Sequence, residues 1–443
     1  MNGIPISISK LLKRVRAKPL VWDTITTTIM SIVGKGIGFL IPFFIAAWFG
    51  VSSKTDSFFF AFGLILFLAQ MFAPAVESVI VPFITDAIAK NEDVGEFLGR
   101  TLGISAVGLS ALAVLFLMVI KPVLSILTRF SPDELNLIQT ILFETAPLVI
   151  LLVWTGILSG TLNAYKIFSI PALSPAFRAI VAIAFIFAFK ESIGVHAIAW
   201  GYVIGEAIRL GILFLFLKKL RLFRLKFSIG WEKSFSQFFR TSSYQIIGLS
   251  VLAFTPIINQ TMASWLGTGN VSLLEYANRL YLIPTTLMSS GLMVTVLSHW
   301  SIDYQTGGEA VLKKNVLNGV KAVGAGGLLL TICIFLAKDY LVSMVYGHGE
   351  FPKEQIHEVA QIFGFFLLGL TPFLIALLYS RAFLTKKNTK VLLFTAMIMV
   401  MGTIIFNLIF MQIMGIRGIA LASSIVAFVS LAVLIFLFHR KTS

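Results

Sequence analysis

The chain of 443 residues is 58% hydrophobic and only 12% charged, and its mean hydropathy is +0.94. Soluble domains are about half apolar and a quarter charged, so this composition excludes an ordinary water-soluble protein. The formal charge of +15 would suit a nucleic-acid partner. We expect none, because the basic residues lie in short segments between apolar runs, as membrane topology requires. The single cysteine excludes a disulfide framework and a cysteine-based metal site.

Apolar runs long enough to cross a bilayer recur along the whole chain. They predict an all-α, polytopic membrane protein of about twelve transmembrane helices, arranged as two homologous six-helix halves around a central cavity. We expect a basic cytoplasmic tail (1–23), an N-terminal half (24–217), a basic cytoplasmic linker (218–236) and a C-terminal half (237–439). The expected spans are 24–49, 56–84, 100–121, 137–163, 166–189, 194–217, 237–265, 270–297, 315–337, 357–384, 391–413 and 415–438.

The two predicted halves resemble each other weakly, at a nearly constant offset. GVHAIAWGYVIGEAIRL, from Gly194, matches GIRGIALASSIVAFVSL, from Gly415, at an offset of 221 residues. AAWFG ending at Gly50 resembles ASWLG ending at Gly267, at an offset of 217. The matches occur in one order, which indicates a duplicated six-helix unit in parallel orientation. Basic residues concentrate in alternate loops, which predicts a multi-pass protein of the cytoplasmic (inner) membrane with both termini in the cytoplasm.

Ionisable residues inside apolar spans are costly unless they face a cavity or a partner, so they are candidate functional residues. Lys35, within a glycine-rich stretch of the first span, and Arg279, in the eighth, suit an anionic head group. Arg holds a phosphate through two hydrogen bonds, whereas Lys acts as a point charge. The structural alternatives are that Lys35 pairs with an acid and that Glu275, four residues before Arg279, neutralises it.

Four further charges belong to the candidate site. Asp56 opens the second span and is either a substrate contact or a helix cap. Glu77, Glu144 and Arg178 are candidate coupling or cavity charges, and either glutamate could carry a proton in a coupled cycle.

Other polar residues have structural explanations at least as good as functional ones. Glu206 and Arg209 lie three residues apart on a predicted helix and should form a structural pair. Several polar side chains of the seventh and eleventh spans offer oxygen ligands to sodium, and hydrogen bonding between helices explains them equally well: Asn259, Gln260, Thr395, Thr403 and Asn407. No nucleotide-binding, nucleophile or metal-ligand motif is present, so we expect no enzyme activity, cofactor or metal.

Five segments carry a family pattern: GKGIGFLIPFFIAAWFGVSSKTDSFFFAF from Gly34, LSGTLNAYKIFSIPALSP from Leu158, VSLLEYANRLYLIP from Val271, YGHGEF from Tyr346 and SRAFLTKKNT from Ser380. In this order they resemble the MurJ (MviN-like) lipid II flippases, a family of the multidrug, oligosaccharidyl-lipid and polysaccharide (MOP) exporter superfamily. The resemblance implies a flippase that moves a polyprenyl-diphosphate-linked glycan, lipid II or a related lipid-linked oligosaccharide, from the cytoplasmic to the outer leaflet by alternating access. It also implies substrate contacts at Lys35, Asp56 and Arg279, and a coupling ion, proton or sodium, or the membrane potential as driving force.

The chain departs from that family where the family carries charge. Ile41 and Pro42 stand in the first span where the family has a second arginine and an acid, Ala69 stands at its second-span cation, and Asn278 replaces the acid beside Arg279. Fewer cations hold a diphosphate less strongly. An exopolysaccharide or O-antigen unit is therefore the first alternative cargo, followed by a cation-coupled multidrug exporter and a non-transporting membrane scaffold.

Overall fold

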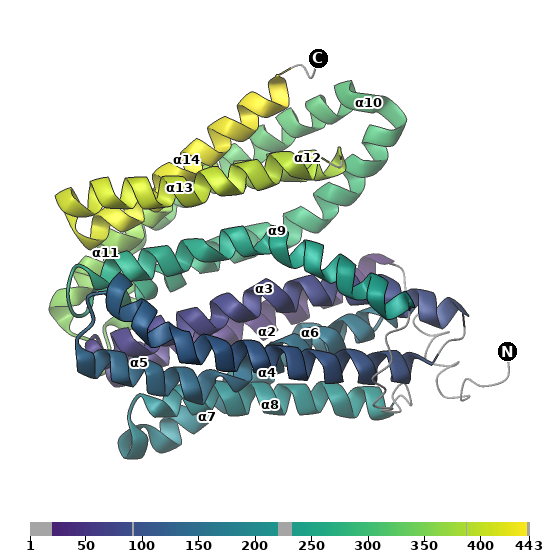
Figure 1. The fold of residues 1–443 in the computed structure, drawn as a ribbon. Helices are drawn as coiled ribbons and strands as arrows, with labels where there is room; N and C mark the ends of the chain where they lie inside the picture. Colours follow the sequence, from purple (N-terminus) through teal and green to yellow (C-terminus); the bar gives the residue numbers. More distant parts are fainter. Residues whose placement is uncertain (1–19, 91–92, 220–232, 387, 441–443) are drawn as a thin grey trace. The chain divides into compact units, whose positions relative to one another are not determined.

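The computed structural model describes residues 20–90, 93–219, 233–386 and 388–440, and every regular element in these ranges is an α-helix (Figure 1). The predicted all-α class is therefore confirmed. The helices are α2 (Leu20–Phe49), α3 (Ser53–Lys90), α4 (Val94–Leu127), α5 (Pro132–Thr145), α6 (Pro147–Ala164), α7 (Ser169–Ile193), α8 (His196–Lys219), α9 (Lys233–Ser264), α10 (Asn270–Tyr346), α11 (Lys353–Leu368), α12 (Leu370–Thr385), α13 (Thr389–Met414) and α14 (Ile416–His439).

Ten segments of the described residues are long and apolar enough to cross a membrane. Two predicted spans, 237–265 and 270–297, are not among them, although they coincide with α9 and the first part of α10. The 77-residue α10 is interrupted at Gly308, whose φ of 67° and ψ of −159° are not helical, so this element contains two helices joined at a kink. The arrangement is consistent with the predicted count of about twelve.

Two predicted spans each consist of a pair of short helices. The span 137–163 corresponds to α5 and α6, which meet at Ala146, where Pro147 occupies the first position of α6. Proline has no N–H to donate, so it suits the first turn of a helix, where that N–H would have no partner, and it interrupts the backbone hydrogen bonds of a helix that precedes it. The span 357–384 corresponds to α11 and α12, which meet at Gly369.

The helices gather into two compact units. Unit 1 consists of Met1–Ile41, Leu64–Val123 and Ile138–Ser250, and unit 2 consists of Pro42–Gly63, Leu124–Leu137 and Val251–Ser443. The predicted tail and most of the predicted linker lie outside the described residues, so the proposed boundaries of the halves stay predictions.

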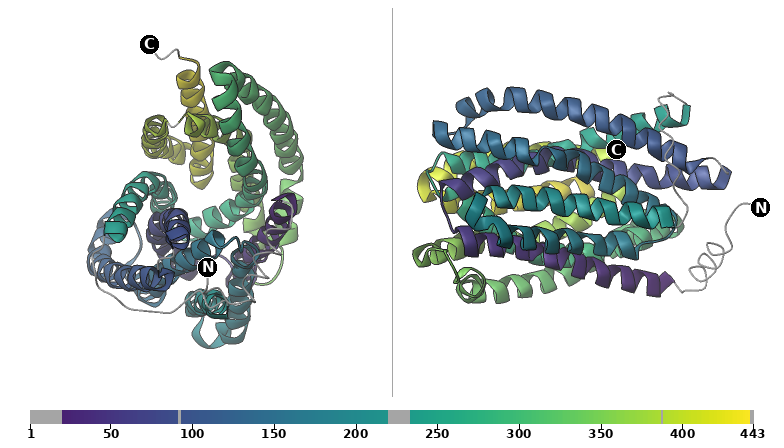
Figure 2. Two further views of the ribbon diagram at one scale, coloured as in Figure 1. Left: turned by 90° about the vertical axis from the view of Figure 1, so that its right-hand side faces the viewer. Right: turned by 90° about the horizontal axis from the view of Figure 1, so that it is seen from below.

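In unit 1, α3, α4, α6, α7 and α8 run side by side (Figures 1 and 2). Glycines on α8 bring it close to α7. A Cβ on Gly205 would lie 2.6 Å from the backbone oxygen of Arg178, and one on Gly201 would lie 3.1 Å from that of Ala182. Small residues four apart allow such close backbone approach, which drives helix association in lipid, where apolar burial contributes little. The close packing places the side chains of α7 and α8 within reach of one another.

In unit 2, α14 packs against α11, α12 and α13, while α10 packs against α11 and α12. The turn that joins α13 to α14 has the same backbone as the one that precedes α8. Gly415 has φ 59° and ψ −134°, and Gly194 has φ 57° and ψ −135°. Only glycine adopts such angles readily. These glycines are the pair aligned at an offset of 221 residues, so the local structure agrees with the internal repeat seen in the sequence.

Candidate functional site

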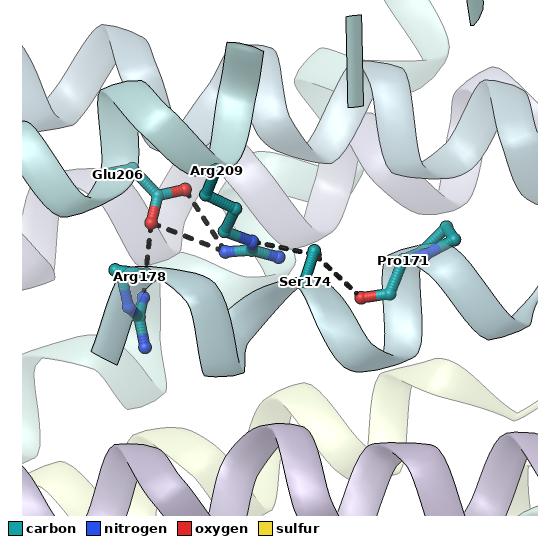
Figure 3. A network of polar contacts seen from close by, with 5 residues as sticks. All are labelled: Pro171, Ser174, Arg178, Glu206 and Arg209. Atoms are coloured by element: carbon teal, nitrogen blue, oxygen red, sulfur yellow. Dashed lines mark hydrogen bonds and ion pairs between the residues drawn. The ribbon is translucent and has the colours of Figure 1, made fainter. Parts of the chain in front are cut away.

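A buried carboxylate in unit 1 is shared by two arginines from neighbouring helices (Figure 3). Glu206, on α8, is fully buried, and its Oε1 lies 3.1 Å from Nη1 of Arg209. Its Oε2 lies 3.4 Å from Nη1 of Arg178, on α7. Nε of Arg209 also donates to the hydroxyl of Ser174 at 2.9 Å, and that hydroxyl donates to the carbonyl of Pro171. The predicted pair of Glu206 and Arg209 is therefore present, and Arg178 joins it.

Lys35 and Glu77 extend this cluster. Gly34 packs tightly on α7, because a Cβ there would lie 2.3 Å from the carbonyl oxygen of Ala172. The neighbouring Lys35 is exposed. Glu77, on α3, interacts electrostatically with both Arg209 and Lys35. Three of the predicted site residues, Lys35, Glu77 and Arg178, thus belong to one charged cluster in unit 1.

Glu144 is not part of this cluster. Its two carboxylate oxygens lie 2.9 and 3.0 Å from Nδ1 of His196, at the first residue of α8. Both side chains are partly exposed. This pair could not be predicted because the two residues are far apart along the chain, and the packing of α6 on α8 brings the end of α5 near the start of α8.

In unit 2, Arg279 is ion-paired with Glu275, one helical turn earlier on α10, with Nη2 2.5 Å from Oε1. Glu275 also accepts a hydrogen bond from Nε2 of Gln260, on α9, at 3.3 Å. Glu275 and Gln260 line a cavity of about 380 Å³ that Asn259, Asn278, Thr403 and Ser423 also border. The alternative in which Glu275 neutralises Arg279 describes this geometry, and the cavity beside the pair is mainly apolar with a few polar side chains.

Amide side chains link three helices next to that cavity. Nδ2 of Asn407, on α13, donates to Oδ1 of Asn259 at 2.8 Å, and Nδ2 of Asn259 donates to the hydroxyl of Ser423, on α14. The hydroxyls of Thr395 and Thr403 donate to backbone oxygens of their own helix. Within the described ranges no three His, Cys, Asp or Glu side chains gather as metal ligands. The amide side chains of Asn259, Gln260 and Asn407 therefore form hydrogen bonds between helices, whereas the two threonines bond within their own helix.

Asp56 caps the start of a helix distant in sequence. The carboxylate is 1% exposed. Its Oδ2 accepts the N–H of Gly269 at 2.5 Å and its Oδ1 accepts the N–H of Ser272 at 2.7 Å, at the first turn of α10. The hydroxyl of Ser272 donates to the same Oδ1. Helix N-terminal amides favour a negative charge, so Asp56 stabilises this end of α10. The sequence offered capping as one alternative, but for the residue's own helix.

Two buried tyrosines extend this contact. The hydroxyl of Tyr276 donates to the carbonyl of Gly50 at 2.8 Å, and the hydroxyl of Tyr346 donates to the carbonyl of Tyr276 at 2.9 Å. The N–H of Glu350 donates to the carbonyl of Ala47. We call the contact of residues 47–56 with residues 269–276 and 346–350 the corner latch. It joins the end of the first predicted span and the start of the second to segments of the other predicted half.

Comparison with known proteins gives the family. The family model described as "Lipid II flippase MurJ" matches residues 45–443. The chain belongs to the lipid II flippase MurJ family. Its relatives include the probable lipid II flippase MurJ of Buchnera aphidicola subsp. Acyrthosiphon pisum, 24% identical over 94% of this chain and 82% of the relative. The lipid II flippase MurJ of Burkholderia cenocepacia is 26% identical over 94% of this chain and 83% of that protein.

Solved structures show the same fold. A lipid II flippase MurJ in an inward closed conformation matches with a TM-score of 0.79 at 23% identity, over 94% of this chain and 87% of that one. An inward-facing multidrug resistance MATE family transporter of the MOP superfamily also matches with a TM-score of 0.79, at 12% identity, over 95% of this chain and all of the other. The expected MOP-type helical membrane fold is confirmed.

Proposed function

We propose that this chain is a flippase that moves lipid II, a lipid-linked glycan, across the membrane. The observation that carries the proposal is the match of the family model over residues 45–443. The many membrane-crossing helices and the ionisable side chains within them suit a protein that carries a charged head group through lipid. We further propose that the cargo moves from the cytoplasmic to the outer leaflet of the inner membrane by alternating access, with both termini in the cytoplasm.

Lys35 and Arg279 are the proposed contacts for the diphosphate of the cargo. Lys35 is exposed on α2, beside a cluster that already contains two arginines. Arg279 is paired with Glu275, which lines the cavity of unit 2, and this one-turn ion pair is one that a phosphate can compete with. A planar guanidinium binds phosphate through two parallel hydrogen bonds, which an ammonium does not.

The direct test is transport of fluorescent lipid II in proteoliposomes, read as the fraction that becomes accessible to a membrane-impermeant quencher. The intact protein should accelerate flipping, and the Lys35→Ala/Arg279→Ala double variant should abolish it at equal protein abundance. Lys313→Ala removes an exposed cation of a surface pair with Glu309 and should leave flipping unchanged. Normal flipping by the double variant would remove both residues from the site. An intact protein that moves a lipid-linked exopolysaccharide unit but not lipid II would favour the alternative cargo.

We also propose sodium as the coupling ion, in preference to a proton. Oδ1 of Asn407 and Oε1 of Gln260 are buried, and neither has a hydrogen-bond donor among the described residues. Amide oxygens coordinate hard cations such as sodium. The test compares flipping with a sodium gradient, a potassium gradient and a pH gradient. Dependence on sodium that Asn407→Leu abolishes would support the assignment, and equal rates in all three would contradict it.

A further inference from the structure

We infer that Arg178 binds the phosphates of the cargo, with Glu206 and Arg209 as positioning residues. The inference rests on the proposed function and adds to it a residue that the family comparison does not supply. Arg178 would provide a second cation on the side of Lys35.

The cluster carries an excess of positive charge. Its cations are Lys35, Arg178 and Arg209, and its acids are Glu77 and Glu206. The charges of Arg178, Arg209, Glu77 and Glu206 balance one another, so the excess is the exposed ammonium of Lys35. A bound phosphate would neutralise that charge.

The two arginines are held differently. Arg209 is fixed on two sides, since Nη1 contacts Glu206 and Nε donates to Ser174. Arg178 contacts Glu206 through Nη1 alone, at the longer distance of 3.4 Å. Its Nε is buried and has no hydrogen-bond acceptor among the described residues. Its side chain is 26% exposed, against 14% for Arg209. Arg178 is therefore the member of the cluster that still has donors to offer.

Those donors lie on the same side as Lys35. Nη2 of Arg178 is 4.0 Å from the position that a Cβ would take on Gly38. Gly38 lies three residues after Lys35, so both occupy nearly one face of α2. Glycine at position 38 therefore places no side chain between this face of α2 and Nη2 of Arg178.

Figure 3 shows how the carboxylate orients the pair. Arg209 and Arg178 approach Glu206 from different sides: Nη1 of Arg209 contacts both carboxylate oxygens, at 3.1 and 3.5 Å, and Nη1 of Arg178 contacts Oε2 alone. Glu206 is completely buried and fixes Nη1 of Arg178. Of the remaining donors of this guanidinium, Nε is buried, so Nη2 is the one that a phosphate would contact.

The experiment measures equilibrium binding of radiolabelled undecaprenyl diphosphate to the purified protein in nanodiscs, with undecaprenol as the uncharged comparison. We expect Arg178→Ala to weaken diphosphate binding by about 10- to 100-fold, the loss typical of a charge-assisted contact. Arg178→Lys should recover part of the affinity, and undecaprenol binding should not change. Lys190→Ala, on the same helix but paired with Glu191 at its end, should bind as the unaltered protein does.

A purely structural role for Arg178 gives a different result. If Arg178 only neutralises Glu206, then Arg178→Ala lowers thermal stability, and Arg178→Ala/Glu206→Gln restores both stability and binding. Under our inference the double variant regains stability while diphosphate binding stays weak. Unchanged binding in Arg178→Ala, or full recovery in the double variant, would overturn the inference. Failure of the unaltered protein to flip lipid II would instead overturn the proposed function.

Discussion

Asp56→Asn tests whether Asp56 holds the corner latch closed within unit 2. The substitution keeps size and shape but replaces one carboxylate oxygen with an NH₂ group. The remaining side-chain oxygen can still accept a hydrogen bond from Ser272. The new NH₂ group then lies opposite the N–H of Gly269, and that N–H loses its acceptor. Losing a hydrogen bond to a charged group costs about 1.5–3 kcal/mol. A loss of about 2 kcal/mol multiplies the open fraction roughly 30-fold.

The assay is the labelling rate of a cysteine buried next to the latch. Ser57→Cys is suitable, because Ser57 is completely buried and its hydroxyl donates only within its own helix. It would be made together with Cys333→Ser, because the native cysteine is exposed. A membrane-impermeant maleimide should then label Asp56→Asn roughly 30-fold faster than the parent, in proportion to the open fraction. Lys54→Ala, an exposed neighbour, is the matched control. Equal labelling rates for Asp56→Asn and the parent would mean that Asp56 does not hold the latch closed.

Two further substitutions test the packing and pairing in unit 1. Gly205→Ala should destabilise the protein by about 1–3 kcal/mol, because the added methyl group meets the backbone of Arg178. The control is Gly211→Ala on the same helix, where the added methyl group meets no described atom within 4 Å outside its own helix. Thermal unfolding in detergent compares the two variants, and equal stability would contradict the close packing of α8 on α7. In the same measurement, Glu144→Gln should lower the free energy of unfolding by about 1 kcal/mol, because the contact with the imidazole of His196 loses the carboxylate charge. A gain in stability would contradict a stabilising pair.

The sequence predicted the helices well because the physical signal for a membrane span is local. A run of apolar residues can satisfy its backbone in lipid only as a helix, so composition alone locates the segment. Hydropathy alone does not locate the breaks inside these spans. The joint at Ala146 and the one at Gly369 each divide an apolar run whose hydropathy gives no indication of it. Whether a proline or glycine bends a helix depends on what packs against it, and that is not local information.

The candidate site was predicted as a set of residues but not as a set of partnerships. Inserting a charge into an apolar run is expensive wherever its partner lies, so Glu144, Arg178 and Asp56 could be recognised singly. Their partners come from distant positions: His196 for Glu144, and Ser272 for Asp56. Short spacings on one helix were the exception. The pairs at three and four residues, Glu206 with Arg209 and Glu275 with Arg279, were both foreseen because helical geometry fixes them.

The charges of the two units suggest different roles in holding an anion. In unit 2, Arg279 forms an ion pair with Glu275, so Arg279 binds a phosphate by giving up part of that contact. In unit 1, three cations face two acids, and Arg178 keeps part of its guanidinium uncommitted. Attraction for a diphosphate should therefore arise mainly in unit 1, while Arg279 contributes only after its pairing with Glu275 changes. A cation that is released from a partner when cargo arrives, and reclaimed when cargo leaves, favours turnover over tight retention, as a transporter requires.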